Sequence, residues 1–245
     1  MSKRLLVLNW KNYPNSLAEA KILLRDLAKK KLLYRKVSLF IAPPLPYLTV
    51  VGERFPLASQ DLPKTLKGTY TGEVSLEILK SFGVRLSILG HSERRELGET
   101  TIEIKEKIKN ALRTGITPLI CFGEKIRDAD GEHFEFLRQE LKTLLNSFSK
   151  AEARKLMLAY EPIWAIGKSA KDSISGEELS ETLVFIKKIL SDLFGRRVAD
   201  KIPILYGGSV EPANAESLIH TGVRGFLIGH ASLNGKSVEE IVKSI

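Results

Sequence analysis

The chain has few residues suited to thiol or metal chemistry. Cys121 is the only cysteine among 245 residues, which excludes an internal disulfide and favours a reducing compartment. No CxxC or HxxH pair is present for a metal site, and no Walker-type loop or dinucleotide-binding glycine pattern occurs. We therefore expect neither a bound metal nor a cofactor.

Long apolar runs are also missing. No run approaches the roughly 20 residues that a membrane-spanning helix needs. The apolar run at residues 5–8 is too short for the core of a signal peptide and instead predicts a strand. With 43% hydrophobic and 27% charged residues, the composition is typical of a soluble globular protein, and we expect a cytoplasmic one.

Acidic residues are fewer than basic ones, and the formal net charge is +9. Basic chains can bind nucleic acid or anionic surfaces. Here the basic residues are spread along predicted helices, with only short clusters at 29–31 and 196–197 and no interleaved aromatic residues. We therefore interpret them as solvated helix faces and expect neither a nucleic-acid nor a membrane partner. Their field could still steer an anionic substrate.

Short apolar runs alternate with longer amphipathic segments along the whole chain. Several runs are apolar throughout, which is typical of parallel strands covered on both faces. The predicted strands are residues 5–8, 37–42, 56–59, 86–89, 117–122, 156–160, 202–206 and 225–228. The predicted helices are residues 17–31, 47–55, 76–82, 101–113, 134–148, 177–194, 213–220 and 238–245.

Several of these helices carry start signals. A hydroxyl residue followed three positions later by Glu predicts a capping box, in which each side chain satisfies a free backbone amide of the other residue. Proline also suits a first helical position, and Pro212 occupies one. The predicted boxes are Ser16/Glu19, Thr100/Glu103, Ser175/Glu178 and Ser237/Glu240.

Eight strands alternating with eight helices predict an α/β fold, and we favour a closed (β/α)8 barrel. No linker, repeat or low-complexity tract interrupts the pattern, so residues 1–245 are interpreted as one domain. An open doubly wound sheet with the same number of strands is the alternative, and periodicity does not separate the two.

In a (β/α)8 barrel, functional groups lie where strands end and the following loops begin. Glu161 lies at such an end, where loss of solvent would raise the pKa of its carboxyl toward that of a useful base. The alternative is a surface glutamate paired with a lysine.

His91 follows another predicted strand and could exchange protons with a substrate oxygen. Backbone amides of a helical turn beginning at Ser92 would disfavour the cationic ring. Lys11 could hold an anion and stabilise negative charge developing on oxygen, and Asn9 lies on the same side of its strand. Taken singly, each of these residues is equally compatible with a structural role.

The last two predicted strands end in glycine. Gly207, Gly208 and Ser209 follow one strand, and Gly229 follows the other. Glycine lets backbone amides approach an anion closely, and phosphate-binding barrels hold the phosphate in these two loops.

Seven segments together closely resemble triosephosphate isomerases, in family order and across nearly the whole chain. GHSERR (90–95) and AYEPIWAIG (159–167) are the most specific of them. The other five are NWK (9–11), TGEVS (71–75), CFGE (121–124), ILYGGSV (204–210) and ASL (231–233). The resemblance implies a TIM barrel and an isomerase of glycolysis and gluconeogenesis that needs no cofactor or metal.

The resemblance also implies a role for each candidate residue. Glu161 abstracts a proton from carbon, while a neutral His91 polarises the carbonyl, as is known for the family. Lys11 and Asn9 support the substrate and its oxyanion. Backbone amides hold the phosphate at Gly167, Ser209, Gly229 and His230.

Further implied features lie outside the reaction centre. Glu93 matches the family's supporting carboxylate near Lys11, and Thr71 matches a loop that enters the neighbouring subunit of a homodimer. Residues 162–164 match the first hinge of a lid, and residues 168–170 match its second hinge. Closure of the lid excludes water from the intermediate.

Two departures from the family pattern affect the phosphate site. Gly167 runs directly into residues 168–170, two residues shorter than the usual lid, so Gly167 matches either of two family glycines. His230 replaces a glycine, which would strain the backbone if the position requires a positive φ. Otherwise its imidazole lies beside the phosphate and adds a pH-sensitive donor.

Three alternatives to the isomerase follow. The first is a barrel acting on a different phosphorylated substrate, although all four catalytic positions of the isomerase are filled. The second is a catalytically impaired phosphate-binding barrel with a shortened lid. The third and least favoured is a basic nucleic-acid-binding protein.

Overall fold

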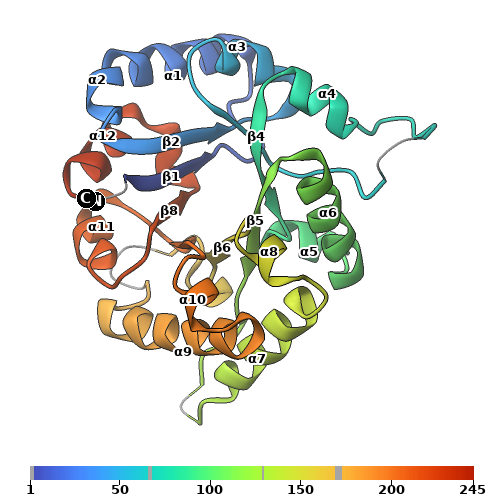
Figure 1. The fold of residues 1–245 in the computed structure, drawn as a ribbon. Coiled ribbons are helices and arrows are strands. Elements are labelled where there is room, and N and C mark those ends of the chain that lie inside the picture. Colours follow the sequence, from blue (N-terminus) through green and yellow to red (C-terminus); the bar gives the residue numbers. More distant parts are fainter. Residues whose placement is uncertain (1–2, 66–67, 129, 169–172) are drawn as a thin grey trace.

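Eight parallel strands form a closed barrel in chain order (Figure 1). The computed structural model describes residues 3–65, 68–128, 130–168 and 173–245. The strands are β1 Arg4–Asn9, β2 Val37–Ala42, β3 Leu57–Ser59, β4 Val84–Leu89, β5 Thr117–Phe122, β6 Met157–Tyr160, β7 Ile204–Tyr206 and β8 Gly225–Ile228. Because β8 pairs with β1, the closed barrel is confirmed and the open sheet is excluded.

Side chains of the strands point alternately into the barrel and out toward the helices. On β1, Leu5 and Val7 belong to the cluster that fills the barrel interior. Leu6 and Leu8 belong to the larger cluster between strands and helices. Both faces of each strand are therefore buried, which explains why the strands are apolar throughout instead of alternating.

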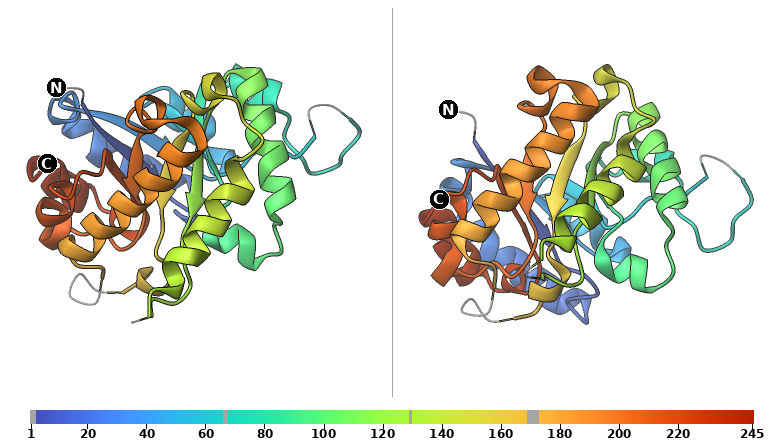
Figure 2. Two further views of the ribbon diagram at one scale, coloured as in Figure 1. Left: turned by 60° about the horizontal axis from the view of Figure 1, so that its bottom comes forward. Right: turned by 90° about the horizontal axis from the view of Figure 1, so that it is seen from below.

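The helices surround the barrel (Figures 1 and 2). Those of eight or more residues are α1 Leu17–Lys29, α6 Thr101–Thr114, α7 Glu132–Leu145, α9 Gly176–Phe194, α11 Pro212–Ile219 and α12 Gly235–Lys243. The shorter ones are α2 Lys31–Tyr34, α3 Leu48–Gly52, α4 Leu76–Ser81, α5 Ser92–Glu96, α8 Lys150–Ala153 and α10 Arg196–Ala199. Single 3-10 turns are η1 Leu45–Tyr47, η2 Ile163–Ala165 and η3 His230–Leu233.

The helix-start predictions were mostly correct. Complete capping boxes begin α6 at Thr100 and α9 at Ser175, and Pro212 is the first residue of α11. At α1, Ser16 accepts the Glu19 amide, but the Glu19 carboxylate takes up the Asn15 amide, so the box is incomplete.

The box predicted at Ser237 was wrong. Helix α12 begins at Gly235, three residues before the start that its apolar pattern indicates. The Asn234 side chain accepts the amides of Lys236 and Ser237 and so caps the helix earlier. The short helices α2, α8 and α10 were not predicted, since four residues are too few to show a periodicity.

All the strands are parallel, so their carboxyl ends and the loops that follow them gather at one face of the barrel. The described parts of one loop, residues 60–65 and 68–75, extend away from the body of the molecule in both views of Figure 2. Among the described residues, no helix is long and apolar enough to cross a membrane.

Candidate active site

A cavity of about 820 Å³ lies at the carboxyl ends of the strands. The residues that line it include seven of the predicted site residues: Asn9, Lys11, His91, Gly167, Ser209, Gly229 and His230. They come from loops after β1, β4, β6, β7 and β8, which the closed barrel brings together. Glu161 does not line this space itself but lies directly beside it, against Gly207 of the lining.

His91 ends the loop after β4 and forms the N-cap of α5. Its Nδ1 accepts a hydrogen bond from the Glu93 backbone amide at 3.3 Å. A ring nitrogen that accepts a hydrogen bond carries no proton, so the contact favours a neutral imidazole whose proton is on Nε2. The predicted helical turn after His91 is therefore confirmed, and it acts through a direct hydrogen bond in addition to its dipole.

Glu161 follows β6 and is 1% exposed. Its Oε2 accepts the Ser92 backbone amide at 3.4 Å, and its Oε1 lies 3.6 Å from His91 Nε2. Oε1 has no hydrogen-bond partner among the described residues. A buried carboxylate oxygen left without a partner is suited to taking up a proton from a substrate, and the burial excludes a surface Glu–Lys pair.

Two glycines make room for Glu161. A Cβ at Gly207 would lie 2.7 Å from Glu161 Cγ, and one at Gly123 would lie 1.9 Å from the Glu161 carbonyl oxygen. Both distances are far below van der Waals contact, so any side chain at either position would displace the glutamate. Gly207 was expected to approach a phosphate, but the atoms nearest to a Cβ added there belong to the Glu161 side chain.

Lys11 has a φ of 52°, the only positive φ of a non-glycine residue in the described part of the chain. Its amide donates to Asn9 Oδ1 at 3.0 Å, and its carbonyl accepts from Gln60 Nε2 at 2.7 Å. These contacts hold a conformation that would otherwise cost about 1–3 kcal/mol. They direct Lys11 Nζ to Glu93 Oε1 at 2.5 Å, the carboxylate that the resemblance indicated.

The opposite wall of the cavity is built from backbone. Gly229 forms the N-cap of η3, so the first amides of that turn are free of partners within it. Gly167 lines the cavity with a φ of 74°. The Ser209 hydroxyl donates to the Ala165 carbonyl at 2.9 Å, which ties the loop after β7 to the turn after β6.

His230 is exposed and begins η3. Since Lys11 is the only described non-glycine residue with a positive φ, the histidine needs no strained backbone here. The condition under which strain was expected, a positive φ, is therefore not met. Proximity of its imidazole to a phosphate stays a prediction.

Comparison with known proteins agrees with this geometry. A family model described as triosephosphate isomerase matches residues 4–245. A triosephosphate isomerase of Fusobacterium nucleatum subsp. nucleatum is 38% identical, over 100% of this chain and 99% of its own. Those of Dictyoglomus thermophilum and Carboxydothermus hydrogenoformans are 35% and 37% identical over at least 99% of both chains.

The chain belongs to the triosephosphate isomerase family. It is an isomerase built on a (β/α)8 barrel. The residues singled out from the sequence come together around one cavity, although their individual roles rest on the geometry above.

Glu124 is a site residue of this isomerase to which the sequence assigned no role. It is 1% exposed, and its Oε1 accepts hydrogen bonds from Tyr160 Oη and Trp164 Nε1, both at 2.8 Å. Burial and the Glu124 charge raise the pKa of the Tyr160 hydroxyl, which therefore remains a donor. Glu124 thus fixes the Trp164 side chain, and its place two residues after β5 was the signal that the sequence offered.

An ionic cluster of the isomerase lies next to Glu161 and His91, around Arg95 and Glu140. Arg95 Nε donates to the Gly90 carbonyl at 2.8 Å, and one terminal nitrogen lies 3.0 Å from Glu140 Oε1. The other oxygen of Glu140 accepts the Gly123 amide at 3.1 Å. Burial raises the pKa of Glu140 to about 7, because desolvation of the carboxylate outweighs the opposing effect of Arg95.

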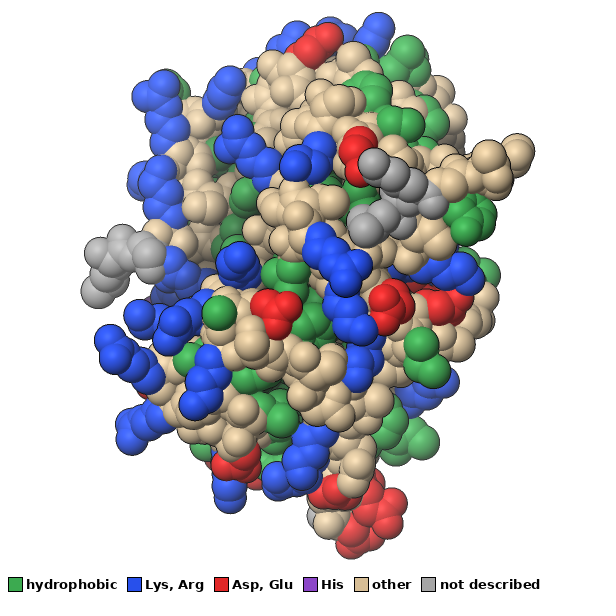
Figure 3. All heavy atoms as spheres, turned by 45° about the vertical axis from the view of Figure 1, so that its right-hand side comes forward, with side chains coloured by type: hydrophobic (Ala, Val, Ile, Leu, Met, Phe, Trp, Pro, Cys, Tyr) green, Lys and Arg blue, Asp and Glu red, His purple; other side chains and the backbone are tan. Residues whose placement is uncertain are grey.

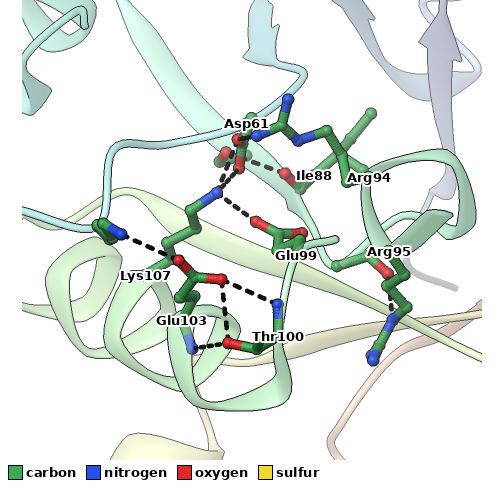
Figure 4. Close-up of polar contacts among 11 residues, drawn as sticks. Asp61, Ile88, Arg94, Arg95, Glu99, Thr100, Glu103 and Lys107 are labelled. Carbon is green, nitrogen blue, oxygen red and sulfur yellow. Dashed lines mark hydrogen bonds and ion pairs between the residues drawn. The ribbon is translucent and has the colours of Figure 1, made fainter. Parts of the chain in front are cut away.

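Thr71 of the isomerase is exposed on the extended loop, beside a half-exposed Tyr70. The base of this loop is tied to the barrel through Asp61 (Figure 4). Asp61 accepts from Lys107 at 2.7 and 2.8 Å and lies 2.9 Å from Arg94, while Lys107 also pairs with Glu99. Residues 66 and 67 lie outside the described residues.

Proposed function

We propose that this isomerase interconverts D-glyceraldehyde 3-phosphate and dihydroxyacetone phosphate through an enediolate, with Glu161 as the base. The observation that carries the proposal is the unpartnered, buried Oε1 of Glu161, which lies 3.6 Å from His91 Nε2 beside the cavity. A base and a neutral donor this close can act on neighbouring carbon and oxygen atoms of one three-carbon substrate.

Glu161 takes a proton from the carbon next to the carbonyl, and the C–H electron pair forms the carbon–carbon double bond of the enediolate. The proton then returns to the other carbon, so that no atom is gained or lost. The Ser92 amide bonded to Oε2 orients the carboxylate for both steps. Gly123 and Gly207 pack against Glu161 and leave it room for this position.

His91 polarises the substrate carbonyl through its Nε2 proton and carries a proton between the two enediolate oxygens. The Glu93 amide holds Nδ1 as an acceptor, so the ring starts as a neutral donor. A neutral imidazole is close to the enediol in acidity, so the proton moves between them easily.

Lys11 stabilises the negative charge that develops on oxygen, and Asn9 supports the same oxygen from the adjacent position of the loop. Glu93 orients the lysine by its ion pair. The Lys11 side chain passes close to Gly229, whose added Cβ would lie 3.3 Å from Lys11 Cε. Its charge therefore reaches both the reacting end and the phosphate end of a bound triose phosphate.

Phosphate is held by the backbone at Gly167, Ser209, Gly229 and His230, which line the same cavity. The lid that covers it has its first hinge at residues 162–164, fixed by Glu124. Of the second hinge, Lys168 lies 5.7 Å from the Trp164 ring centre. Residues 169 and 170 of that hinge lie outside the described residues.

The assembly and setting are proposals as well. We place the enzyme in the cytoplasm, in glycolysis and gluconeogenesis, as a single domain over residues 1–245. A homodimer is supported by the extended loop that exposes Thr71 and a 53% exposed Tyr70. No metal or cofactor is needed for the steps above.

A coupled assay of purified protein with D-glyceraldehyde 3-phosphate tests the proposal. We expect ketone product and its loss in a Glu161→Gln variant. A catalytically impaired phosphate-binding barrel would instead bind a phosphate analogue without turnover. That outcome would reject the proposed activity while leaving the phosphate site intact.

A further inference from the structure

Every strand of the barrel has an exposed or partly exposed basic residue within four residues of its start. Because the strands are parallel, these residues gather at the amino-terminal face, opposite the active site. We call this set the basic ring: Lys3, Arg4, Arg35, Lys36, Arg54, Arg85, Arg113, Arg154, Lys155, Lys201 and Arg224. The sequence disperses them over more than 200 positions, so only the closed fold shows them as one surface.

The charge of the basic ring is not balanced locally. Within the described residues, no member of the ring forms an ion pair, whereas lysines near the active site such as Lys11 and Lys107 do. Only two acidic residues, Glu53 and Asp200, directly adjoin the ring members in sequence. Figure 3 shows one side of the molecule, on which Lys and Arg side chains are widespread and Asp and Glu gather in few places.

Helix capping does not account for the ring. The preceding helices end near this face, and their carbonyl ends attract cations. Within the described residues, however, Arg4 alone among the ring side chains forms a hydrogen bond, to the Val223 carbonyl at 3.1 Å. The other side chains therefore remain available to a partner.

Two apolar side chains project within the ring. Leu32 of α2 is 74% exposed between Lys31 and Arg35, and Phe82 is 43% exposed three residues before Arg85. A surface that combines basic residues with protruding apolar side chains fits the headgroup region of an anionic bilayer. The basic residues attract the leaflet, and the apolar side chains enter it.

We propose that the basic ring, with Leu32 and Phe82, docks this isomerase on anionic membrane surfaces. The ring spreads its charge over an area, as a leaflet does, and not along the groove or stripe that follows a nucleic-acid backbone. Tyr34 and Phe55, the aromatic residues beside Arg35 and Arg54, are buried, and the exposed Phe82 is a single ring and not the series of stacking platforms that a nucleic-acid strand uses. Docking through this face leaves the active-site mouth open to the solvent.

Co-sedimentation of the full-length enzyme with vesicles tests the proposal. We expect binding to vesicles of phosphatidylcholine with phosphatidylserine and little binding to phosphatidylcholine alone. At about 1 M ionic strength, where the Debye length is about 3 Å, most of the bound enzyme should be released. Isomerase turnover should be the same for bound and free enzyme. Equal binding to both kinds of vesicle would overturn the proposal.

A matched pair of variants separates the ring from the net charge. In one, Arg35, Lys36 and Arg85 are changed to Gln. In the control, Lys21, Lys125 and Lys188, which are exposed outside the ring, are changed to Gln. Each basic residue near an anionic surface strengthens binding about fivefold. The first variant should therefore bind on the order of a hundredfold more weakly, and the control only a few-fold more weakly. Equal losses would reject the ring as the docking surface.

A third variant and a competitor test the kind of partner. Leu32→Ser should weaken vesicle binding several-fold and make the remainder more sensitive to salt. Single-stranded RNA should compete poorly. If RNA displaces the vesicles at lower concentration than free lipid headgroup, and Leu32→Ser has no effect, the surface is a nucleic-acid site and the proposal is wrong. Turnover serves as the measure of correct folding for every variant.

Discussion

The two ends of the barrel use the same residue types in opposite ways. At the mouth, Lys11, Arg95 and Lys107 are each held against a carboxylate, and the catalytic Glu161 and His91 are buried. At the amino-terminal face, the members of the basic ring, such as Arg54 and Lys201, are exposed or partly exposed and have no carboxylate partner within the described chain. At the mouth, the effect of each charged side chain therefore depends on its exact position. At the amino-terminal face, we expect it to depend on how many basic side chains are gathered there.

The largest effect should come from the proposed base. Glu161→Gln keeps the shape of the side chain and removes its basicity, so kcat should fall about a thousandfold or more. The coupled assay measures this, and circular dichroism checks the fold. Glu177→Gln, an exposed change at the start of α9, is the control. Near-normal isomerisation by the Glu161 variant would exclude it as the base.

Displacing Glu161 without altering it should cost almost as much. In Gly207→Ala, the new Cβ would lie 2.7 Å from Glu161 Cγ and push the carboxylate away from the substrate. A misplacement of about 1 Å lowers kcat on the order of a hundredfold. Gly176→Ala is the matched control, since its new Cβ meets nothing closer than 3.7 Å. Equal kcat values for the two variants would show that the position of Glu161 is not critical.

The ionic cluster around Arg95 and Glu140 should appear in the pH dependence of stability. The pKa of Glu140, about 7, lies above the ordinary 4.5, so the native state binds this proton more tightly than the unfolded state. The resulting stabilisation is complete below about pH 4.5 and is lost as the pH rises through 7.

Glu140→Gln removes this titration. The difference in free energy of unfolding between wild type and variant should change by on the order of 3 kcal/mol between pH 4.5 and 8. Urea unfolding across that range measures it, with the exposed Glu135→Gln as control. A constant difference would mean that Arg95 keeps the native carboxylate charged.

His230→Gly should have a modest effect at the mouth. The backbone needs no glycine there, so stability should stay within about 0.5 kcal/mol, while loss of the exposed imidazole should raise KM a few-fold and leave kcat nearly unchanged. Steady-state kinetics at pH 6 and pH 8 separate the two constants. An unchanged KM at both values would remove His230 from the phosphate site.

The smallest effect should come from the opposite face. Arg113→Gln, within the basic ring, breaks no ion pair of the described chain and should change the free energy of unfolding by less than about 0.5 kcal/mol. Thermal unfolding measures it, and Arg95→Gln, which breaks a partly buried pair, gives the contrast. Similar losses of stability in both variants would contradict the difference between paired basic residues at the mouth and unpaired ones at the amino-terminal face.

Much of this arrangement could be predicted from the sequence, because strand ends in a parallel barrel must meet. That rule placed Asn9, Lys11, His91 and Glu161 at one face before any coordinates were considered. Family resemblance then supplied the pairing of Lys11 with Glu93, which no local pattern contains.

What escaped prediction depends on contacts between distant segments. The contact of Glu124 with Trp164 and the raised pKa of Glu140 each depend on residues far apart in the sequence. The His91 Nδ1 contact spans only two residues but depends on the geometry of the turn after β4. The start of α12 was mispredicted for a local reason. The Asn234 side chain caps the helix three residues before Ser237, directly after η3. The basic ring could not be recognised as one surface from the sequence, because linear spacing carries no information about closure of the barrel.

The lone thiol of the chain has a practical consequence. Cys121 lies on β5 inside the barrel with no exposed surface, and burial, together with nearby Glu161, raises its pKa. Alkylating reagents attack only the thiolate, and they reach this one only when strands separate. The rate at which the native enzyme takes up a single label therefore reports how often the barrel itself opens, free of any signal from surface fraying.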